Sequence, residues 1–130
     1  MSRASSTRKL LRAKDLIDAH YAEPLELRVL AVAAGISSTH FSRQFRRSFG
    51  ETPHQYLISR RLERAAALLR NTDRPVAEIC RAVGLRSVGS FTTSFGRAFG
   101  RSPLAYRAAH GPDRDAGAVP GCAVRMWARP

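Results

Sequence analysis

One stretch of this chain is repeated about 50 residues later, and this repeat limits the folds that the chain can adopt. The first copy contains Ala34-Gly35-Ile36, Phe41, Phe45, Phe49-Gly50, Pro53 and Tyr56, and the second contains Val83-Gly84-Leu85, Phe91, Phe95, Phe99-Gly100, Pro103 and Tyr106. The offset is 50 residues from the first phenylalanine onward but 49 at the glycines Gly35 and Gly84. The second copy therefore has one extra residue in its turn. Because Ser37 and Ser87 both precede the first phenylalanine by four residues, Arg86 is the expected insertion.

Within each copy, the residues predict a helix, a short turn and a second helix. The first helix ends at a glycine, which readily adopts the left-handed conformation of a C-terminal cap. A serine, Ser37 or Ser87, then supplies a side-chain oxygen that can cap the next helix. Each second helix ends at another glycine, after which a Thr-Pro or Ser-Pro pair starts a further helix. This order is the helix-turn-helix layout. Helix–glycine–helix patterns occur in many all-α proteins, but two matched copies on a basic chain favour DNA binding.

The spacing of apolar residues elsewhere completes an all-α fold of about seven helices, with two helix-turn-helix subdomains joined by a long connecting helix. An amphipathic helix is predicted over Arg8–Tyr21. The other predicted helices are Leu27–Ala34, which we expect to be buried, Pro53 to about Arg70, Pro75 to about Val83, and Ser102 to about Ala109. We expect a first subdomain over residues 8–57, the connecting helix over 53–70, a second subdomain over 71–110 and a flexible tail over 111–130.

The charge of the chain indicates a polyanionic partner. It has 22 basic residues against 10 acidic ones, a net charge of +12, and all the basic residues except Lys9 and Lys14 are arginines. The planar guanidinium group suits phosphates and guanine edges. Charge alone does not separate DNA from RNA, the ribosome or an anionic membrane. No apolar run reaches the length of a membrane span, and no secretory signal is recognisable, so a cytoplasmic location is expected.

The residue types that catalysis or metal binding requires form no pattern. Cys80 and Cys122 are far apart in the sequence and predict neither a metal site nor a disulfide framework. Cys80 lies among apolar residues and is expected to be a core thiol. The four histidines lack metal-ligand spacing, and no Ser/His/Asp set, phosphate loop or carboxylate pair is found. We expect no enzyme activity, no metal and no cofactor.

The second helix of the first copy has the composition of a recognition helix, the helix that enters the major groove. Phe41, Phe45 and Phe49 recur every four residues and form its buried stripe. A major-groove helix contacts bases mainly with residues near its N-terminus. The predicted base-reading residues of this helix are Thr39, His40, Ser42 and Arg43. The predicted phosphate contacts are Ser37, Arg46 and Arg47.

The equivalent helix of the second copy has short side chains on the same face. Its predicted base-reading residues are Val88, Gly89, Ser90, Thr92 and Thr93, of which Val88, Thr92 or Thr93 can meet a thymine methyl group. Its predicted phosphate contacts are Arg86, Ser87, Arg97 and Arg101. We therefore expect the first unit to dominate base readout and the second to contribute affinity and positioning.

Taken together, the paired motifs resemble the DNA-binding domain of AraC/XylS-type transcription regulators over about residues 8–108. The resemblance implies double-stranded DNA as the partner, with two recognition helices in successive major grooves on one face. It further implies a stand-alone small member that acts as a monomer on DNA, with RNA polymerase as a further partner. Gly89 and Gly96 depart from the family pattern, in which bulkier residues are common at these positions.

Two other classes of function remain as alternatives. A basic nucleic-acid-binding protein without sequence preference would bind all duplexes alike, and the uneven recognition faces argue against it. An enzyme is disfavoured by the missing catalytic patterns.

Overall fold

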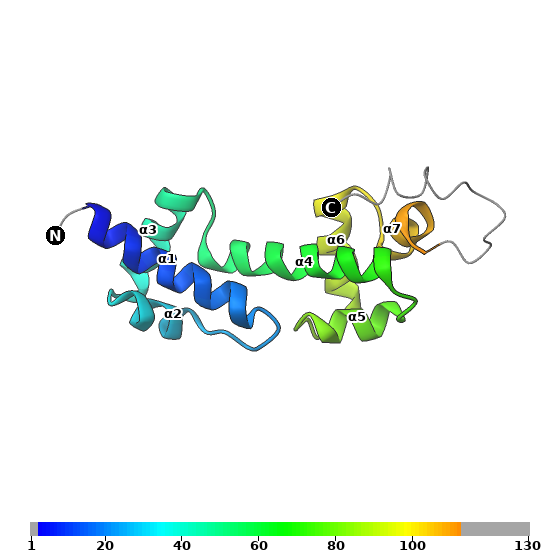
Figure 1. Cartoon of the computed structure of the whole chain (residues 1–130), viewed down its shortest axis with the longest axis horizontal. Coiled ribbons are helices and arrows are strands. Elements are labelled where there is room, and N and C mark those ends of the chain that lie inside the picture. The colour runs from blue at the N-terminus through cyan, green and yellow to red at the C-terminus, as the bar shows by residue number, and fades with distance from the viewer. Residues whose placement is uncertain (1–2, 113–130) are drawn as a thin grey trace. The chain divides into compact units, whose positions relative to one another are not determined.

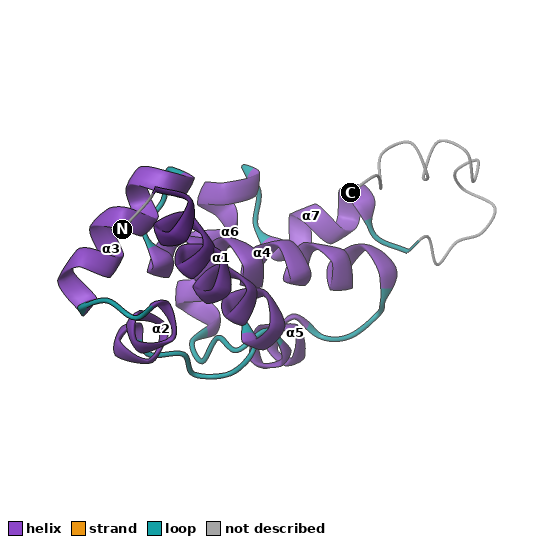
Figure 2. Cartoon of the chain, turned by 60° about the vertical axis from the view of Figure 1, so that its left-hand side comes forward, coloured by secondary structure: helices purple, strands orange, loops and turns teal. Residues whose placement is uncertain are grey.

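The chain folds into helices joined by short loops, as a computed structural model that describes residues 3–112 shows (Figures 1 and 2). Within that range it has seven helices and no strand, which confirms the predicted all-α fold. The helices are α1 (Arg3–His20), α2 (Leu27–Ala34), α3 (Ser38–Phe49), α4 (Pro53–Asn71), α5 (Val76–Ala82), α6 (Val88–Phe99) and α7 (Pro103–His110). None of them is long and apolar enough to cross a membrane. Residues 113–130 of the predicted tail, Cys122 among them, lie outside the described range.

The chain divides into two compact units, Met1–Arg61 and Leu62–Pro130, and the division falls within α4. Unit 1 contains α1, α2, α3 and the first half of α4, whereas unit 2 contains the second half of α4 with α5, α6 and α7. One helix therefore contributes to both hydrophobic cores.

The core of unit 1 is built on the phenylalanine stripe of α3. Phe41 and Phe45 have no exposed surface, and their rings meet edge to face with centroids 5.7 Å apart. The surrounding buried residues are Leu10, Ala13 and Ile17 of α1, Leu30, Ala31 and Ala34 of α2, and Leu57 of α4. Each large apolar side chain buried in this way contributes about 1.5–3 kcal/mol. Phe49, the last residue of the predicted stripe, is only half-buried and lies beneath the ammonium group of Lys14, 4.8 Å from its ring centroid.

Unit 2 repeats this core with its own phenylalanines. Phe91 and Phe95 are buried, and the Phe95 ring packs against Phe99 and Tyr106 with centroid distances of 4.5 and 5.3 Å. The other buried residues of the unit include Leu62, Ala65, Ala66, Leu68 and Leu69 of α4, and Ile79, Cys80 and Val83. The phenylalanines that the sequence repeat has in common therefore form equivalent cores in the two units.

Side-chain caps begin the helices where the sequence predicts them. The hydroxyl oxygens of Ser37 and Ser87 accept hydrogen bonds from the backbone N–H groups of His40 and Ser90, at 3.4 and 3.2 Å. Such a cap contributes about 1 kcal/mol. Thr52 and Gln55 form the reciprocal bonds of a capping box before α4, at 3.2 and 2.9 Å. The cap serines lie outside α3 and α6, which begin one residue later.

The backbone of the two turns confirms that Arg86 is the inserted residue. Before the insertion the bonds match at an offset of 49: Ile36 N–H donates to the Ala31 carbonyl, and Leu85 N–H to the Cys80 carbonyl. After it they match at 50: Phe41 and Phe91 donate to the carbonyls of Ser37 and Ser87. One residue, Arg86, separates Leu85 from Ser87, whereas Ile36 and Ser37 are adjacent.

Three helix predictions need correction. The first helix begins at Arg3 and ends at His20, earlier than predicted at both ends. The second predicted helix, α2, is not buried throughout, because Val29 and Val32 are 47% and 78% exposed. Pro75 caps α5 instead of opening it, and α5 ends at Ala82, two residues before the left-handed Gly84.

The repeated tyrosines join each core to a neighbouring helix. In unit 1 the Tyr56 hydroxyl donates to the Asp18 carboxylate at 2.6 Å, which links α4 to α1. In unit 2 the Arg70 guanidinium donates to the Tyr106 hydroxyl at 2.7 Å, which links α4 to α7.

Arg61 of α4 provides a second link in unit 1, to the residues that follow α1. It is only 9% exposed and donates to the carbonyls of Tyr21 and Glu23 at 2.6 and 2.9 Å. Burial lowers the pKa of this guanidinium, and the two carbonyls accept from its charged form.

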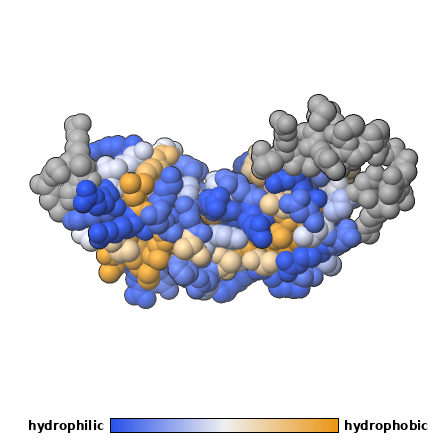
Figure 3. All heavy atoms as spheres, viewed as in Figure 1, coloured by the Kyte–Doolittle hydropathy of each residue, from blue (hydrophilic) through white to orange (hydrophobic). Residues whose placement is uncertain are grey.

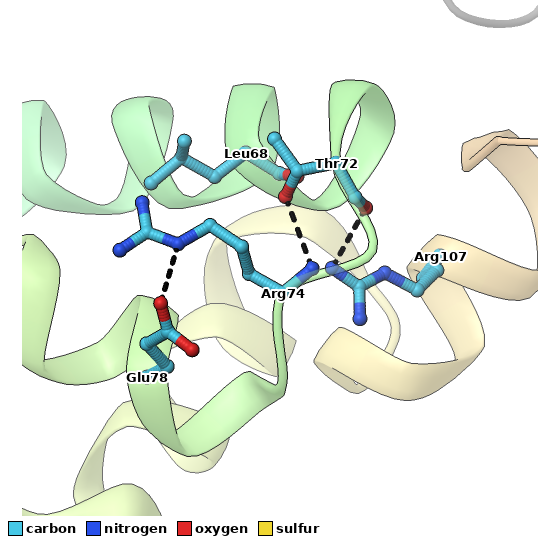
Figure 4. Close-up of polar contacts among 5 residues, drawn as sticks. All are labelled: Leu68, Thr72, Arg74, Glu78 and Arg107. Carbon is cyan, nitrogen blue, oxygen red and sulfur yellow. Dashed lines mark hydrogen bonds and ion pairs between the residues drawn. The ribbon is translucent and has the colours of Figure 1, made fainter.

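The end of α4 is held by polar contacts within unit 2 (Figure 4). The guanidinium of Arg107 donates to the Thr72 carbonyl at 3.1 Å and to the Leu69 carbonyl at 3.3 Å. Arg74 bonds through its backbone to the Thr72 hydroxyl and through its side chain to Glu78, at 3.3 and 2.8 Å. These contacts tie α7 and the start of α5 to the last turn of α4.

Candidate nucleic-acid interface

The exposed face of α3 carries five of the residues predicted from the sequence to touch DNA. Because Phe41 and Phe45 occupy the buried side, the opposite side of the helix faces solvent. The exposed residues are Thr39, His40, Arg43, Arg46 and Arg47. Thr39, His40 and Arg43 lie in the first half of the helix, and the other two arginines lie in its last turn. This arrangement has the order that a major-groove helix uses, with base contacts ahead of phosphate contacts.

Ser42 occupies a different position from the other predicted base-reading residues of α3. It is half-buried and lines a shallow groove of about 260 Å³ beside α2 and the start of α4. The groove is mainly apolar, with Leu27, Leu30 and Leu57 among its lining residues. Ser42 therefore lies at the edge of the exposed face. Its sequence position predicted that it lies within that face, but α2 and the start of α4 border the same groove and leave Ser42 half-buried.

The exposed face of α6 has shorter side chains and fewer charges than the exposed face of α3. Val88, Gly89, Ser90, Thr93 and Arg97 are exposed. Thr92, like Ser42 in α3, is half-buried. Arg86 and Ser87 are exposed just before the helix, and Arg101 just after it. The structure thus brings the predicted residues of the second unit to one helix and its two flanking loops.

Neither α3 nor α6 contains an acidic residue, so nothing within either helix neutralises its arginines. Within residues 3–112, Arg43, Arg46 and Arg47 form no ion pair. Ion pairs occur on other elements, such as Arg28 with Glu26 and Arg74 with Glu78. The arginines of α3 are therefore available to a negatively charged partner.

The helix α2 has an exposed apolar surface that the sequence patterns did not predict. Leu27, Val29 and Val32 are 40%, 47% and 78% exposed, and Figure 3 shows a hydrophobic patch over this helix on an otherwise mostly hydrophilic face. Every residue of α2 except Arg28 is apolar, so the sequence led us to expect more burial than the helix has. An eight-residue helix packed on one side leaves its other side in solvent.

The cysteine and histidine positions provide no metal site in the described part of the chain, where no cluster of metal-ligating residues occurs. Cys80 is fully buried in the core of unit 2, as predicted, and its thiol contacts the Leu85 carbonyl at 3.4 Å. Burial raises the pKa of this thiol, and the neighbouring Arg81 opposes the shift.

Comparison with known proteins places this arrangement in a family. The model of a helix-turn-helix domain matches residues 30–109. The regulatory protein SoxS of Salmonella typhimurium is 38% identical over 91 residues, which cover 70% of this chain and 85% of SoxS. The DNA-binding domain of AdpA, a global transcriptional factor solved in complex with a target DNA, has 36% identity and a TM-score of 0.73, covering 77% of this chain and 90% of that domain. An AraC-type transcriptional regulator from Chromobacterium violaceum has 32% identity and a TM-score of 0.73, covering 82% and 95%.

The family model begins within α2 and ends within α7, so its match includes both predicted recognition helices, α3 and α6. The chain belongs to the AraC/XylS-type family of helix-turn-helix DNA-binding transcription regulators.

Proposed function

We propose that this chain regulates transcription by binding a specific double-stranded DNA sequence, with α3 and α6 entering successive major grooves. The observation that carries the proposal is the face of α3, where three exposed arginines follow Thr39 and His40 on a helix without acidic residues. Such a face can contact base edges and phosphates together. The DNA complex of the related AdpA domain supports the choice of partner. Because the partner is DNA, the proposed place of action is the cytoplasm.

The proposed base contacts of the first unit are made by Thr39, His40, Ser42 and Arg43, with Arg43 as the strongest reader. A guanidinium can donate two parallel hydrogen bonds to O6 and N7 of guanine. Ser42 has a smaller role, because it lies at the half-buried edge of the face. Arg46, Arg47 and the Ser37 cap hold phosphates.

The second unit is proposed to contribute mainly affinity. Arg97 lies in the last turn of α6, and Arg86, Ser87 and Arg101 lie in the loops at its two ends. Phosphate contacts of this kind fix the register of a protein on the duplex without reading its sequence. On this proposal, residues 8–57 and 71–110 form the two DNA-binding subdomains, joined by the connecting helix over 53–70.

The exposed faces of α3 and α6 differ, so one chain would bind a DNA site whose two halves differ in sequence. We therefore propose that the protein binds this asymmetric site as a monomer. A regulator of this kind acts on transcription through a further contact, and RNA polymerase is the proposed partner.

Selection of bound sites from random duplex, followed by footprinting, tests the proposal. We expect one asymmetric site whose footprint spans two adjacent major grooves. The Kd for this site should be at least about 10³-fold lower than for a scrambled duplex at the same salt concentration. Equal Kd values would identify a non-specific basic nucleic-acid-binding protein, and a palindromic site would contradict the monomer.

A further inference from the structure

The face of α6 contains two glycines that the fold of this chain does not require. Gly89 and Gly96 stand where α3 has Thr39 and Arg46. Neither has the left-handed backbone that favours glycine. A Cβ atom added at Gly89 would lie 3.8 Å from the Ser87 hydroxyl oxygen, and one at Gly96 would lie 3.9 Å from a backbone oxygen. Both distances are ordinary van der Waals contacts, so alanine fits at either position. Glycine within a helix is less stable than alanine, so both glycines lower the stability of α6 without a benefit to its packing.

Thr93 lies between these glycines on the exposed face, and its hydroxyl group is already engaged. Its Oγ1 donates a hydrogen bond to the Gly89 carbonyl at 3.1 Å, within the same helix. With the hydroxyl proton committed to the backbone, the methyl group is the part of the side chain left for a partner. Threonine is short, so this methyl can reach a base only if the helix backbone comes close to the groove floor. The missing side chains at Gly89 and Gly96 allow that approach.

We propose that Thr93 is a specificity-determining residue, and that it selects thymine through contact between its methyl group and the C5-methyl group of the base. Thymine is the only one of the four DNA bases that presents a methyl group in the major groove. Val88, an apolar residue 43% exposed in the first turn of α6, extends the same preference. The second unit thus reads sequence by shape, at a T·A pair, while the first unit reads it by hydrogen bonds. This inference rests on the proposed function, which supplies the DNA-facing role of α6.

Two substitutions of opposite chemistry test the role of Thr93. Thr93→Ser keeps the hydroxyl and removes the methyl, whereas Thr93→Val keeps the methyl and removes the hydroxyl. Each protein is measured against the selected duplex and against the same duplex with deoxyuridine in place of thymine, one position at a time, in the second half-site. Deoxyuridine lacks only the C5-methyl group. The matched control is the same replacement outside the footprint.

We expect one position at which deoxyuridine raises the Kd about fourfold for the wild type and for Thr93→Val, the loss that removal of one buried methyl-sized group predicts. Thr93→Ser should bind the thymine and deoxyuridine duplexes equally. The inference is overturned if Thr93→Ser still discriminates, if Thr93→Val does not, or if no position responds in the wild type. A wild type that does not distinguish the selected site from scrambled duplex would instead refute the proposed function itself.

Gly96→Ala tests whether Gly96 serves the close approach of α6 to DNA or the stability of the fold. The free protein should melt at a higher temperature, because alanine stabilises the helix, while the Kd for the selected duplex rises. A lower melting temperature would show that the fold needs this glycine. An unchanged Kd would show that α6 does not approach DNA closely at this point.

Discussion

Replacement of Arg43 gives the sharpest test of how α3 reads DNA. Its side chain is exposed and forms no ion pair within the described residues. Arg43→Ala should therefore change the free energy of unfolding by no more than about 0.5 kcal/mol, as is usual for surface substitutions. Any large effect on DNA binding is then a loss of contacts with DNA and not a loss of fold.

The expected size of that effect follows from the geometry of the contact. A bidentate contact from arginine to guanine gives about 1–3 kcal/mol of discrimination against the wrong base, which is a factor of about 5 to 150 in Kd. Arg43→Ala should raise the Kd for the selected duplex by this factor and abolish the preference at one base pair. Arg43→Lys keeps the charge but not the planar pair of donors, so it should lose most of the preference while the salt dependence of binding stays unchanged.

The assay is fluorescence anisotropy with the selected duplex and the three variants of the contacted base pair, repeated over a range of salt concentrations. Arg47→Ala is the matched control, because Arg47 is an exposed arginine of the same helix in its last turn. It should weaken binding to all four duplexes equally and lower the slope of log K against log salt by about one. If Arg43→Ala also weakened all four duplexes equally, Arg43 would be a phosphate contact and the assignment of roles along α3 would be wrong.

Three further predictions concern unit 2. Arg97→Ala should weaken binding to every sequence alike and lower the salt slope by about one, and a sequence-selective loss in anisotropy would contradict its phosphate role. Gly111→Ala should destabilise the protein by about 1–3 kcal/mol in chemical denaturation, because a Cβ atom there would lie 2.5 Å from the Arg107 carbonyl oxygen and 2.7 Å from its Cγ atom; an unchanged midpoint would show that α7 can shift at no cost. Burial raises the pKa of the Cys80 thiol in the folded protein above its value in the unfolded chain. The neutral thiol therefore favours the folded state, and this contribution is complete below the unfolded pKa and is lost as the pH rises through the folded pKa. The unfolding free energy of the wild type should therefore fall more steeply above about pH 8.5 than that of Cys80→Ala, and parallel pH profiles would refute this.

The helical features that depend on neighbours in sequence were predictable from the chain alone. The phenylalanines of α3 and α6 identify their buried faces by spacing, because residues four apart lie on one side of a helix. Ser37, Ser87 and the Thr52–Gln55 pair cap helices through atoms at most three residues away. The position of Arg86 followed from matching the two copies, and the turn bonds of the backbone confirm it.

The contacts between distant segments were decided only by the tertiary structure. Tyr56 was visible as a repeated residue, but its bond to Asp18 spans 38 residues, and no local pattern predicts it. Ser42 belonged to the exposed face by its helical angle, yet the packing of α2 and α4 leaves it half-buried at the edge of a groove.

Gly89 and Gly96 are a further case in which the sequence supplied part of the answer and the tertiary structure supplied the rest. From the sequence we knew only that larger side chains are common at these two positions in the family. The space around each, and the hydroxyl that Thr93 directs to the Gly89 carbonyl, became visible once α6 was packed on its core. Periodicity determines which face of a helix is buried, because it depends on one helix. What an exposed face can offer to DNA depends on the atoms that the rest of the fold places around it.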